Sequence, residues 1–459
     1  MADQLKQTHI EENAAPTIEP GAAPAVAIEL IQPEVRASEL DKIIVRGGRP
    51  LNGTIPISGA KNAVLKHMCA ALLSDEALTL TNVPTGLRDV RFLGQVLSHL
   101  GVTVGLSSDG KAILHAKNIK THIAPYDLVR KMRASVLVLG PLLARHGQAE
   151  VSLPGGCSIG GRPIDLHLKG LEALGATIEI ENGYVKATAP KGGLKGAHIN
   201  FPFPSVGATD QLMMAATLAR GETIITNAAR EPEIIDQGAA LNKMGAKIEG
   251  LGTSELRIQG VERLSGATHE VVADRIETGT WLCAVGMTGG KIRLKKTSMA
   301  LLPALAAPFE AAGIDIQADG SDLIACAAGT HIPGVDIMTE VHPGIPTDMQ
   351  AQFMALMTRC EGASMITETI FENRFMHVPE LNRMGADITV QGQSALVRGV
   401  ERLKGTDVMA TDLRASVALV LAGLVAEGQT TVHRIYHLER GYERMVEKLS
   451  AAGADIEKQ

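Results

Sequence analysis

The sequence predicts an α/β protein of two domains, each built from three copies of one structural unit. Six short segments share a pattern of a leucine, methionine or alanine, then a glycine, then a strand-forming run; their glycines are Gly101, Gly175, Gly245, Gly313, Gly385 and Gly453. Successive glycines lie 68 to 74 residues apart, and so even a step indicates a repeated unit. The length of 459 residues exceeds what one core usually organises, so we expect three units in each of two domains.

Each unit is expected to run helix, strand, helix, strand, strand. An apolar helical stretch comes first, for example 133–147 or 347–362. A short β-rich run follows, and then a second amphipathic helix that ends at the glycine, which suits a helix C-terminus. The glycine segment opens a strand, and a hairpin closes the unit. In 176–190 the turn is Asn182-Gly183, a pair that favours two-residue hairpin loops.

The two ends of the chain are expected to meet in one domain. The sixth unit stops at Gln459, soon after its glycine, so its missing strands have to come from 41–58. We therefore expect one domain over 61–272 and a discontinuous second domain over 41–60 plus 273–459. A cleft between two such domains is the default place for a ligand.

Residues 1–40 differ from the rest in composition. Four prolines lie among alanine and glutamate, with weak periodicity, which is typical of a disordered tail. The alternative is an extra helix or strand that docks on the body. Seven acidic residues against Lys6 and Arg36 place most of the net charge of −6 in this segment. The body is close to neutral and has no basic stripe, so nothing indicates a nucleic-acid partner.

The cysteines and the apolar runs point to a cytoplasmic protein without a metal centre. The five cysteines are scattered, with no CxxC pair and no Cys/His cluster of zinc spacing, so we expect free thiols in a reducing compartment. The N-terminus lacks the pattern of a signal peptide. The longest apolar runs, such as 415–426, have about a dozen residues, which suits a buried helix rather than a membrane span.

One glycine-rich loop, PGGCSIGGRP at 154–163, holds a thiol and a guanidinium, Cys157 and Arg162. Glycines imply backbone freedom or close approach to a ligand, whereas a structural cysteine is expected inside an element. From these residues alone, two alternatives stay open: a reactive thiol, or an exposed cysteine on a surface loop.

Several motifs in chain order resemble those of the UDP-N-acetylglucosamine 1-carboxyvinyltransferases, a family of enolpyruvyl transferases. They include SGAKNAVL (58–65), PGGCSIGGRPIDLH (154–167), SVGATDQ (205–211), PTDMQAQF (346–353) and ERGYER (439–444). The resemblance covers 41–459. It implies two inside-out α/β barrels, each of three βαβαββ units with helices inside. It also implies transfer of enolpyruvate from phosphoenolpyruvate to the 3-hydroxyl of UDP-N-acetylglucosamine, with release of phosphate, as the first committed step of peptidoglycan synthesis. No cofactor is implied.

The resemblance implies two catalytic residues. Cys157 would donate the proton to the methylene carbon of phosphoenolpyruvate, and the same thiol would be alkylated by the epoxide fosfomycin. A thiol beside an arginine has a lowered pKa and is more reactive. Asp348 would accept the proton of the sugar hydroxyl or position that hydroxyl. The alternative for Asp348 is an N-cap, since it opens an apolar helix.

The resemblance also assigns the substrate contacts. Phosphoenolpyruvate would be bound by Lys61, Asn62, Arg162 and Arg440, whose convergence requires domain closure; taken singly, each cation is an ordinary surface charge. The nucleotide sugar would contact Arg133, Arg162, Pro163, Ile164, Asp165, Leu166, Ser205, Val206, Gly207, Asp348 and Ile370. Cleft support is expected from Glu231, Asp274, Arg374 and Arg414, with structural ion pairs as the alternative. Phe203 stands where a lysine often contacts the nucleotide phosphates in this family, so either Arg133 suffices for that contact or another cation substitutes.

Two other functions remain open. The first is 5-enolpyruvylshikimate-3-phosphate synthase activity, which shares the fold and the chemistry; the PGGC loop and SVGATDQ argue against it. The second is a non-catalytic protein that binds UDP-sugars. The presence of Cys157, Asp348, Lys61, Arg162 and Arg440 together argues against a chain that has lost catalysis.

Overall fold

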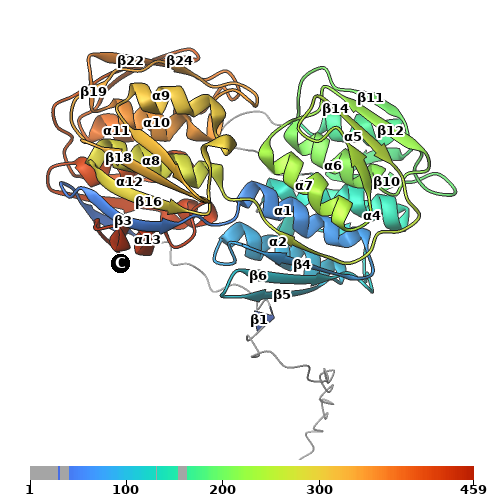
Figure 1. Ribbon diagram of the computed structural model, residues 1–459. Coiled ribbons are helices and arrows are strands. Elements are labelled where there is room, and N and C mark those ends of the chain that lie inside the picture. Colours follow the sequence, from blue (N-terminus) through green and yellow to red (C-terminus); the bar gives the residue numbers. More distant parts are fainter. Residues whose placement is uncertain (1–28, 31–40, 131, 154–162) are drawn as a thin grey trace, which may run out of the picture.

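The computed structural model describes residues 29–30, 41–130, 132–153 and 163–459, which form two bodies side by side (Figure 1). Buried apolar side chains between Ala60 and Val271 form one core cluster. A second cluster joins buried side chains of 43–57 to those of 276–456. Each body therefore has a hydrophobic core of its own.

Six sheets in the described residues repeat one topology. In the sheet β11-β12-β14-β13, the edge strand β11 (His198–Asn200) runs parallel to β12 (Glu222–Thr226). Strand β14 (Glu255–Gln259) pairs antiparallel with both β12 and β13 (Lys247–Glu249). Between them, α6 (Val206–Ala216) follows β11 and α7 (Pro232–Lys243) follows β12. The order is strand, helix, strand, helix, strand, strand, which contains the expected unit and adds an edge strand before it.

Four strands in each of the other five sheets have the same pattern of one parallel and two antiparallel pairings. They are β15 (Ala267–Glu270)-β4 (Ala77–Thr81)-β6 (Lys111–His115)-β5 (Thr103–Ser107); β7 (Ile123–Ala124)-β8 (Gln148–Ser152)-β10 (Tyr184–Thr188)-β9 (Thr177–Glu181); β3 (Leu51–Pro56)-β16 (Gly290–Lys295)-β18 (Asp322–Ala327)-β17 (Asp315–Asp319); β20 (Ile337–Met338)-β22 (Ala363–Thr367)-β24 (Ser394–Arg398)-β23 (Asp387–Gln391); and β25 (Asp407–Met409)-β26 (Gln429–His433)-β2 (Ile43–Arg46)-β27 (Asp455–Lys458). A short parallel pair joins β19 (Ile332–Pro333) to β21 (Cys360–Glu361).

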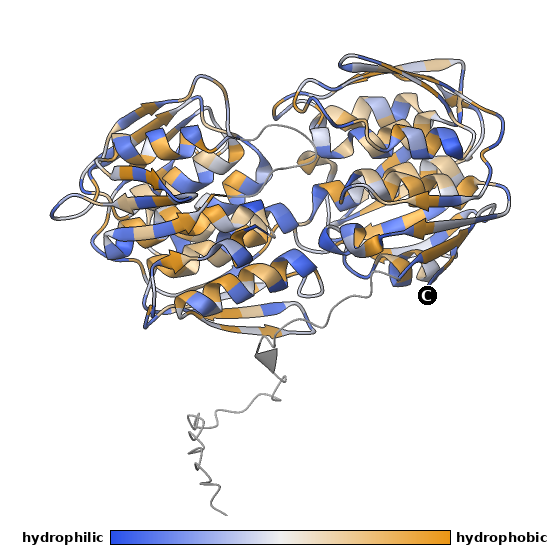
Figure 2. Ribbon diagram, turned by 180° about the vertical axis from the view of Figure 1, so that it is seen from behind, coloured by the Kyte–Doolittle hydropathy of each residue, from blue (hydrophilic) through white to orange (hydrophobic). Residues whose placement is uncertain are grey.

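The most apolar helices lie inside the bodies, where Figure 2 shows hydrophobic residues concentrated. All eight residues of α10 (Gln350–Met357) are buried, as are all but the last of α8 (Arg275–Thr288) and of α12 (Ala415–Val425). A helix that is apolar all round has to be buried all round. The outer helix α2 (Arg88–Leu100) instead buries one face. The remaining α-helices are α1 (Lys61–Ala70), α3 (Tyr126–Val129), α4 (Leu139–His146), α5 (Asp165–Ala173), α9 (Ala306–Ala311), α11 (Val378–Arg383) and α13 (Met445–Ala451).

The six repeat glycines all have the left-handed backbone that a helix end requires. Their φ angles lie between 79° and 109°, and Gly101 is the C-cap residue of α2. The predicted hairpin turn is confirmed as well, because Asn182 (φ 52°) and Gly183 (φ 79°) connect β9 to β10.

Strands β2 and β3 lie in the body that contains the end of the chain, but they join two sheets rather than one. β2 lies between β26 and β27, so it completes the sheet of the last unit as expected. The expectation that all of 41–58 would complete that unit is wrong for β3, which runs parallel to β16 in the sheet of the fourth unit. β3 takes there the edge place that β15 takes beside β4 in the other body, and Figure 1 shows this blue strand against the yellow β16.

Within the predicted tail, residues 1–40, the structure describes only Glu29–Leu30. These two residues form strand β1, which pairs antiparallel with β5. The docked-strand alternative therefore holds for this pair, and the rest of the tail prediction lies outside the described residues. No helix in the described part of the chain is both long enough and apolar enough to cross a membrane.

Candidate active site

Polar side chains from both bodies meet where the N-terminus of α1 faces the second body. Asn62, in the first turn of α1, donates to Asp348 Oδ2 at 3.3 Å. Arg440, the last residue of a 3-10 helix (Ile435–Arg440), donates through Nε to Asp89 Oδ1 in the first turn of α2 at 2.8 Å. Asn62 thus contacts Asp348, and Arg440 contacts Asp89; both contacts join residues far apart in sequence.

Asp348 is held by two arginines. It lies in a 3-10 turn (Thr347–Met349) directly before α10, and no side chain caps either helix. Its Oδ1 accepts from Arg374 Nη2 at 2.6 Å, and its Oδ2 lies 3.6 Å from Arg414 Nε. The N-cap alternative for Asp348 is therefore not the contact that this structure shows.

The charge of Asp348 is fixed by these neighbours. Burial alone would raise the pKa of its carboxyl, but Arg374 and Arg414, with a smaller effect from Lys61, hold that pKa well below its usual range. A carboxylate in this state stays ionised throughout the physiological range. It accepts hydrogen bonds strongly, but it is a weak base and holds a proton poorly.

Lys61 and Arg440 share one buried carboxylate. Lys61 Nζ lies 2.8 Å from Asp89 Oδ2, and the side chain of Asp89 is 1% exposed. Burial lowers the pKa of Lys61, Asp89 counters that effect, and Arg414 and Arg440 add to it. Burial would raise the pKa of Asp89, but Lys61 and Arg440 together lower it. The three groups form an ionic cluster that spans the two bodies.

Asp274 and Arg414 form a further set of contacts beside Lys61 and Asp348. Asp274 caps α8 by accepting from the amides of Ile276 (2.8 Å) and Glu277 (3.1 Å). Its other oxygen lies 3.4 Å from the amide of Lys61 and 3.7 Å from Arg414 Nη2. The Arg414 guanidinium also stacks over the ring of Tyr442 at 5.2 Å. These contacts are the structural ion pairing that was the alternative expected for Asp274 and Arg414.

Glu231 lies at the start of α7 rather than in the cluster. One of its carboxylate oxygens is buried without a hydrogen-bond partner in the described residues, and burial raises its pKa. Nearby, Arg275 Nε forms an ion pair with Glu233 Oε1 at 2.9 Å. The sequence did not single out that pair.

The described residues predicted for the nucleotide sugar lie on five segments: Arg133, 163–166, 205–207, Asp348 and Ile370. Arg133 donates to the carbonyl of Pro163 at 3.1 Å. Ser205 caps α6, so Val206 and Gly207 form its first turn. The amide of Ile370 donates to Glu368 Oε1 at 2.8 Å. Ile164 and Leu166 are buried, whereas Pro163, Asp165 and Phe203 are exposed. A Cβ added to Gly207 would lie 3.0 Å from the His167 ring, so that ring would have to shift slightly to admit a side chain.

Cys157 and Arg162 lie outside the described residues. Among the described cysteines, Cys69, Cys283 and Cys360 are buried and Cys326 is exposed. Burial raises the pKa of the Cys69 and Cys283 thiols, so neither is a thiolate at neutral pH. Neither of these two buried cysteines is a rival nucleophile.

A second cluster, His67, Asp236 and His269, has the donor types of a metal site. Asp236 already accepts from both imidazoles at 2.8 Å and from the amide of Val272 at 3.1 Å. Those separations are hydrogen bonds, and they tie α1, α7 and β15 together. The cluster braces the helix that begins with Lys61.

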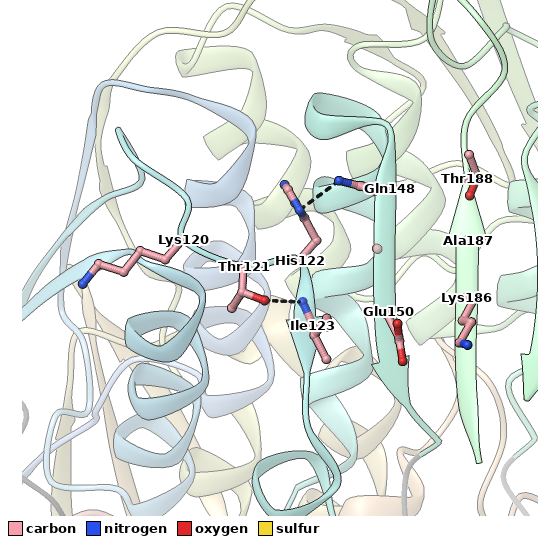
Figure 3. Close-up of a pocket in the computed structure, with 10 residues that line it drawn as sticks. Lys120, Thr121, His122, Ile123, Gln148, Glu150, Lys186, Ala187 and Thr188 are labelled. Carbon is pink, nitrogen blue, oxygen red and sulfur yellow. Dashed lines mark hydrogen bonds between the residues drawn. The ribbon is translucent and has the colours of Figure 1, made fainter. Parts of the chain in front are cut away.

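An open hollow beside β7, β8 and β10 lies apart from these residues. Figure 3 shows His122 hydrogen-bonded to Gln148, and Lys120 pointing away from the other labelled side chains. Lys120, Glu150 and Lys186 mix charges of both signs along its wall. None of the predicted site residues lines it.

Sequence reasoning missed Asp89. Its only signal is an acidic residue in the first turn of an amphipathic helix, and such residues are common because they complement the helix dipole. Only the fold shows that this acid faces two cations instead.

Comparison with known proteins places the chain among enolpyruvyl transferases. The family model "EPSP synthase (3-phosphoshikimate 1-carboxyvinyltransferase)" matches residues 45–449. The UDP-N-acetylglucosamine 1-carboxyvinyltransferase of Rhodospirillum centenum (strain ATCC 51521 / SW) is 59% identical over 428 residues, covering 91% of this chain and 99% of that protein. The enzyme of the same name from Caulobacter vibrioides (strain NA1000 / CB15N) is 58% identical over 420 residues, covering 91% and 97%.

Solved structures agree on the fold. The enolpyruvyl transferase NikO from Streptomyces tendae superimposes with a TM-score of 0.83 at 25% identity, over 92% of this chain and 99% of that one. EPSP synthase from Acinetobacter baumannii gives a TM-score of 0.69 at 18% identity, over 91% and 100%. The second likeness concerns the fold alone.

Proposed function

Because the chain belongs to the UDP-N-acetylglucosamine 1-carboxyvinyltransferase family of enolpyruvyl transferases, we propose that it transfers enolpyruvate from phosphoenolpyruvate to the 3-hydroxyl of UDP-N-acetylglucosamine. Phosphate is released, and the product enters peptidoglycan synthesis. The observation that carries the proposal is the cross-body cluster of Lys61, Asn62, Asp348 and Arg440 in a chain 57–59% identical to relatives of that name.

The reaction is an addition followed by an elimination. The sugar oxygen attacks C2 of phosphoenolpyruvate while C3 takes up a proton, which gives a tetrahedral phosphate-bearing intermediate. Loss of a proton from the new methyl group then re-forms the double bond as phosphate leaves. The reaction needs an acid near C3, an acceptor near the sugar hydroxyl and cations for the carboxylate and phosphate.

We assign the acid to Cys157 on the strength of the PGGC motif. The same assignment makes Cys157 the residue that fosfomycin alkylates, by attack of the thiolate on the epoxide carbon. The described thiols Cys69 and Cys283 do not compete for this role, since both are buried.

Asp348 is assigned to the sugar hydroxyl. Its ionised carboxylate accepts a hydrogen bond from that hydroxyl and orients the oxygen toward C2. The two arginines that lower its pKa favour this positioning role over lasting uptake of the proton. Arg374 and Arg414 keep the carboxylate charged and fix its direction.

Phosphoenolpyruvate is assigned to Lys61, Arg162 and Arg440, with Asn62 beside them. The amide end of α1 adds donors and a favourable dipole for an anion. The nucleotide sugar is assigned to the Arg133–Pro163 region, residues 164–166, the first turn of α6 at Ser205–Gly207, and Ile370. Phe203 is 58% exposed and carries no charge, so Arg133 is assigned the phosphate contact.

The finer architecture belongs to the same proposal. We assign each body to an inside-out α/β barrel of three βαβαββ repeats, with domain boundaries at 61–272 and at 41–60 plus 273–459. We also assign the enzyme to the cytoplasm, where its two substrates are made.

Phosphate release from phosphoenolpyruvate tests the proposal. The assay is run with UDP-N-acetylglucosamine, with shikimate 3-phosphate and with neither. Release with the sugar nucleotide alone is expected. Release with shikimate 3-phosphate alone would overturn the assigned acceptor. Folded protein that binds UDP-N-acetylglucosamine and releases no phosphate would be a binding protein instead of an enzyme.

A further inference from the structure

Asp89 lies between the two bodies, beside Lys61 and Arg440, and the reaction as described above does not use it. Its side chain is 1% exposed, and it contacts Lys61 and Arg440, with one oxygen 2.8 Å from each. Lys61 and Asp89 belong to one body, and Arg440 belongs to the other. A single carboxylate therefore joins the two cations assigned to phosphoenolpyruvate, one from each body.

We infer that Asp89 is a positioning residue for phosphoenolpyruvate, which holds Arg440 beside Lys61 so that both cations face the incoming substrate. The inference rests on the proposed function of the cleft. It adds a residue that contacts no reacting atom and acts through its two partners.

The geometry leaves donors on Arg440 for a ligand. Arg440 uses Nε at 2.8 Å and Nη2 at 3.5 Å for Asp89. Its Nη1 donates no hydrogen bond within the part of the chain that the structure describes. A guanidinium has five N–H donors in a fixed plane. The substrate can therefore bind the free edge of Arg440 while the edge facing Asp89 stays paired.

Charge balance requires such a carboxylate. Lys61 faces Arg440 and Arg414, and the remaining acids nearby, Asp274 and Asp348, are already paired with arginine or with amides. Without Asp89, three cations would repel one another in a buried space. Lys61, whose pKa burial already lowers, would then lose its proton more easily.

The competing explanation is purely structural. An acid in the first turn of α2 stabilises that helix through its dipole. Such a role would affect the stability of the protein without affecting one substrate more than the other. The two explanations therefore predict different kinetics.

Asp89→Asn tests the inference, because it removes the charge and keeps the size. We expect the KM for phosphoenolpyruvate to rise about tenfold or more, with a smaller change in kcat. We also expect the alkaline limb of kcat/KM to move to lower pH. The Kd for UDP-N-acetylglucosamine, measured by calorimetry, should stay within about twofold. Unchanged KM and pH profile with a lower Tm, or an equal loss of affinity for both substrates, would overturn the inference.

Glu443 provides the matched control. It also joins the bodies, since it accepts from the Gly86 amide at 2.7 Å and from the Ser58 hydroxyl at 3.0 Å. Glu443→Gln should leave the KM for phosphoenolpyruvate and its pH dependence unchanged. A tenfold rise there too would show that any cross-body contact suffices, and would overturn the specific role of Asp89.

Two further measurements keep the test decisive. If Asp89→Asn does not fold, Asp89→Glu keeps the charge but displaces it by one methylene. A raised KM with an unchanged pH profile then supports the inference, and an unchanged KM overturns it.

If the wild-type protein releases no phosphate, the proposed function fails. The inference is then tested by calorimetric binding of phosphoenolpyruvate to wild type and Asp89→Asn, and equal affinities overturn it.

Discussion

At the scale of single residues, the site depends on carboxylates that arginines keep ionised. Asp348 contacts Arg374 Nη2 at 2.6 Å and lies 3.6 Å from Arg414. Arg374 is itself 5% exposed and also donates to Thr347 at 2.8 Å, so its guanidinium has little freedom to turn away. The charge of Asp348 is therefore a property of the arrangement and not of the residue alone.

Arg374→Gln is expected to make turnover sensitive to acid. The folded-state pKa of Asp348 is depressed, so its ionised form persists to low pH in the wild type. Without Arg374, burial raises that pKa, and activity falls as the pH falls through the new value. The measurement is kcat against pH. Arg374→Lys keeps a positive charge and is expected to retain the wild-type profile more closely; parallel profiles for Arg374→Gln and wild type would contradict this account.

Cys157→Ser is expected to lose most turnover and to resist alkylation by fosfomycin. The reason is that a hydroxyl is a far weaker acid and nucleophile than a thiol beside Arg162. Turnover and intact-protein mass measure the two effects. Cys326→Ser is the control, since Cys326 is the exposed cysteine among those described. Full turnover by Cys157→Ser would remove this residue from the proton-donor role.

The sequence could predict individual site residues only where they lie within a recognisable motif. Asn62, Asp348 and Arg440 were predicted from motifs; in the fold Asn62 contacts Asp348, whereas Arg440 contacts Asp89. Asp89 had no such motif, because its importance comes from a partner 351 residues away in the chain. The N-cap alternative for Asp348 was reasonable locally, but two arginines from distant segments decide its contacts.

At the scale of elements, the repeat depends on helix ends with left-handed glycines. Gly101 (φ 109°) and Gly245 (φ 102°) lie at equivalent places after α2 and α7. Their surroundings differ, however. A Cβ on Gly101 would lie 2.6 Å from the carbonyl oxygen of Asn118, whereas a Cβ on Gly245 would meet no atom within 4 Å.

Substitutions at Gly101 and Gly245 separate the energetic cost of backbone strain from the cost of steric crowding. Gly245→Ala is expected to destabilise the protein by about 1–2 kcal/mol, the cost of a left-handed non-glycine residue. Gly101→Ala carries the same strain plus a collision with backbone, so it is expected to cost clearly more. Thermal unfolding of both variants measures the difference. Equal losses would show that the chain near Asn118 moves aside freely.

Local sequence patterns predicted helices and turns better than they predicted which strands pair with each other. The Asn182-Gly183 hairpin and the buried helix near 415–426 were readable because a turn pair and an apolar run are local signals. The pairing of β3 with β16 was not readable, since a six-residue strand can add to any suitable sheet edge. The two-residue strand β1 is too short for periodicity to reveal.

At the scale of the whole molecule, the chain from β2 onward crosses between the bodies twice. It leaves the second body after β2 and β3, passes to the first at α1, and returns to the second at α8. Both crossings lie beside the site, near Lys61 and Asp274. The joint between the bodies and the substrate cations are thus the same region, so relative motion of the bodies changes the cation spacing directly.

Two core substitutions test whether the bodies are separate folding domains. Ile55 in β3 and Leu80 in β4 are both 0% exposed, but they belong to different core clusters. Each change to alanine is expected to cost about 2–5 kcal/mol. If the proposed boundaries are right, Ile55→Ala lowers the transition of the body formed by 41–60 plus 273–459, and Leu80→Ala lowers that of 61–272. Calorimetry measures the transitions, and hydrogen exchange assigns each one to its body. The same single transition lowered equally by both variants would show that the bodies unfold together, because the contacts at Asp89 and Asp348 couple them more strongly than two independent domains allow.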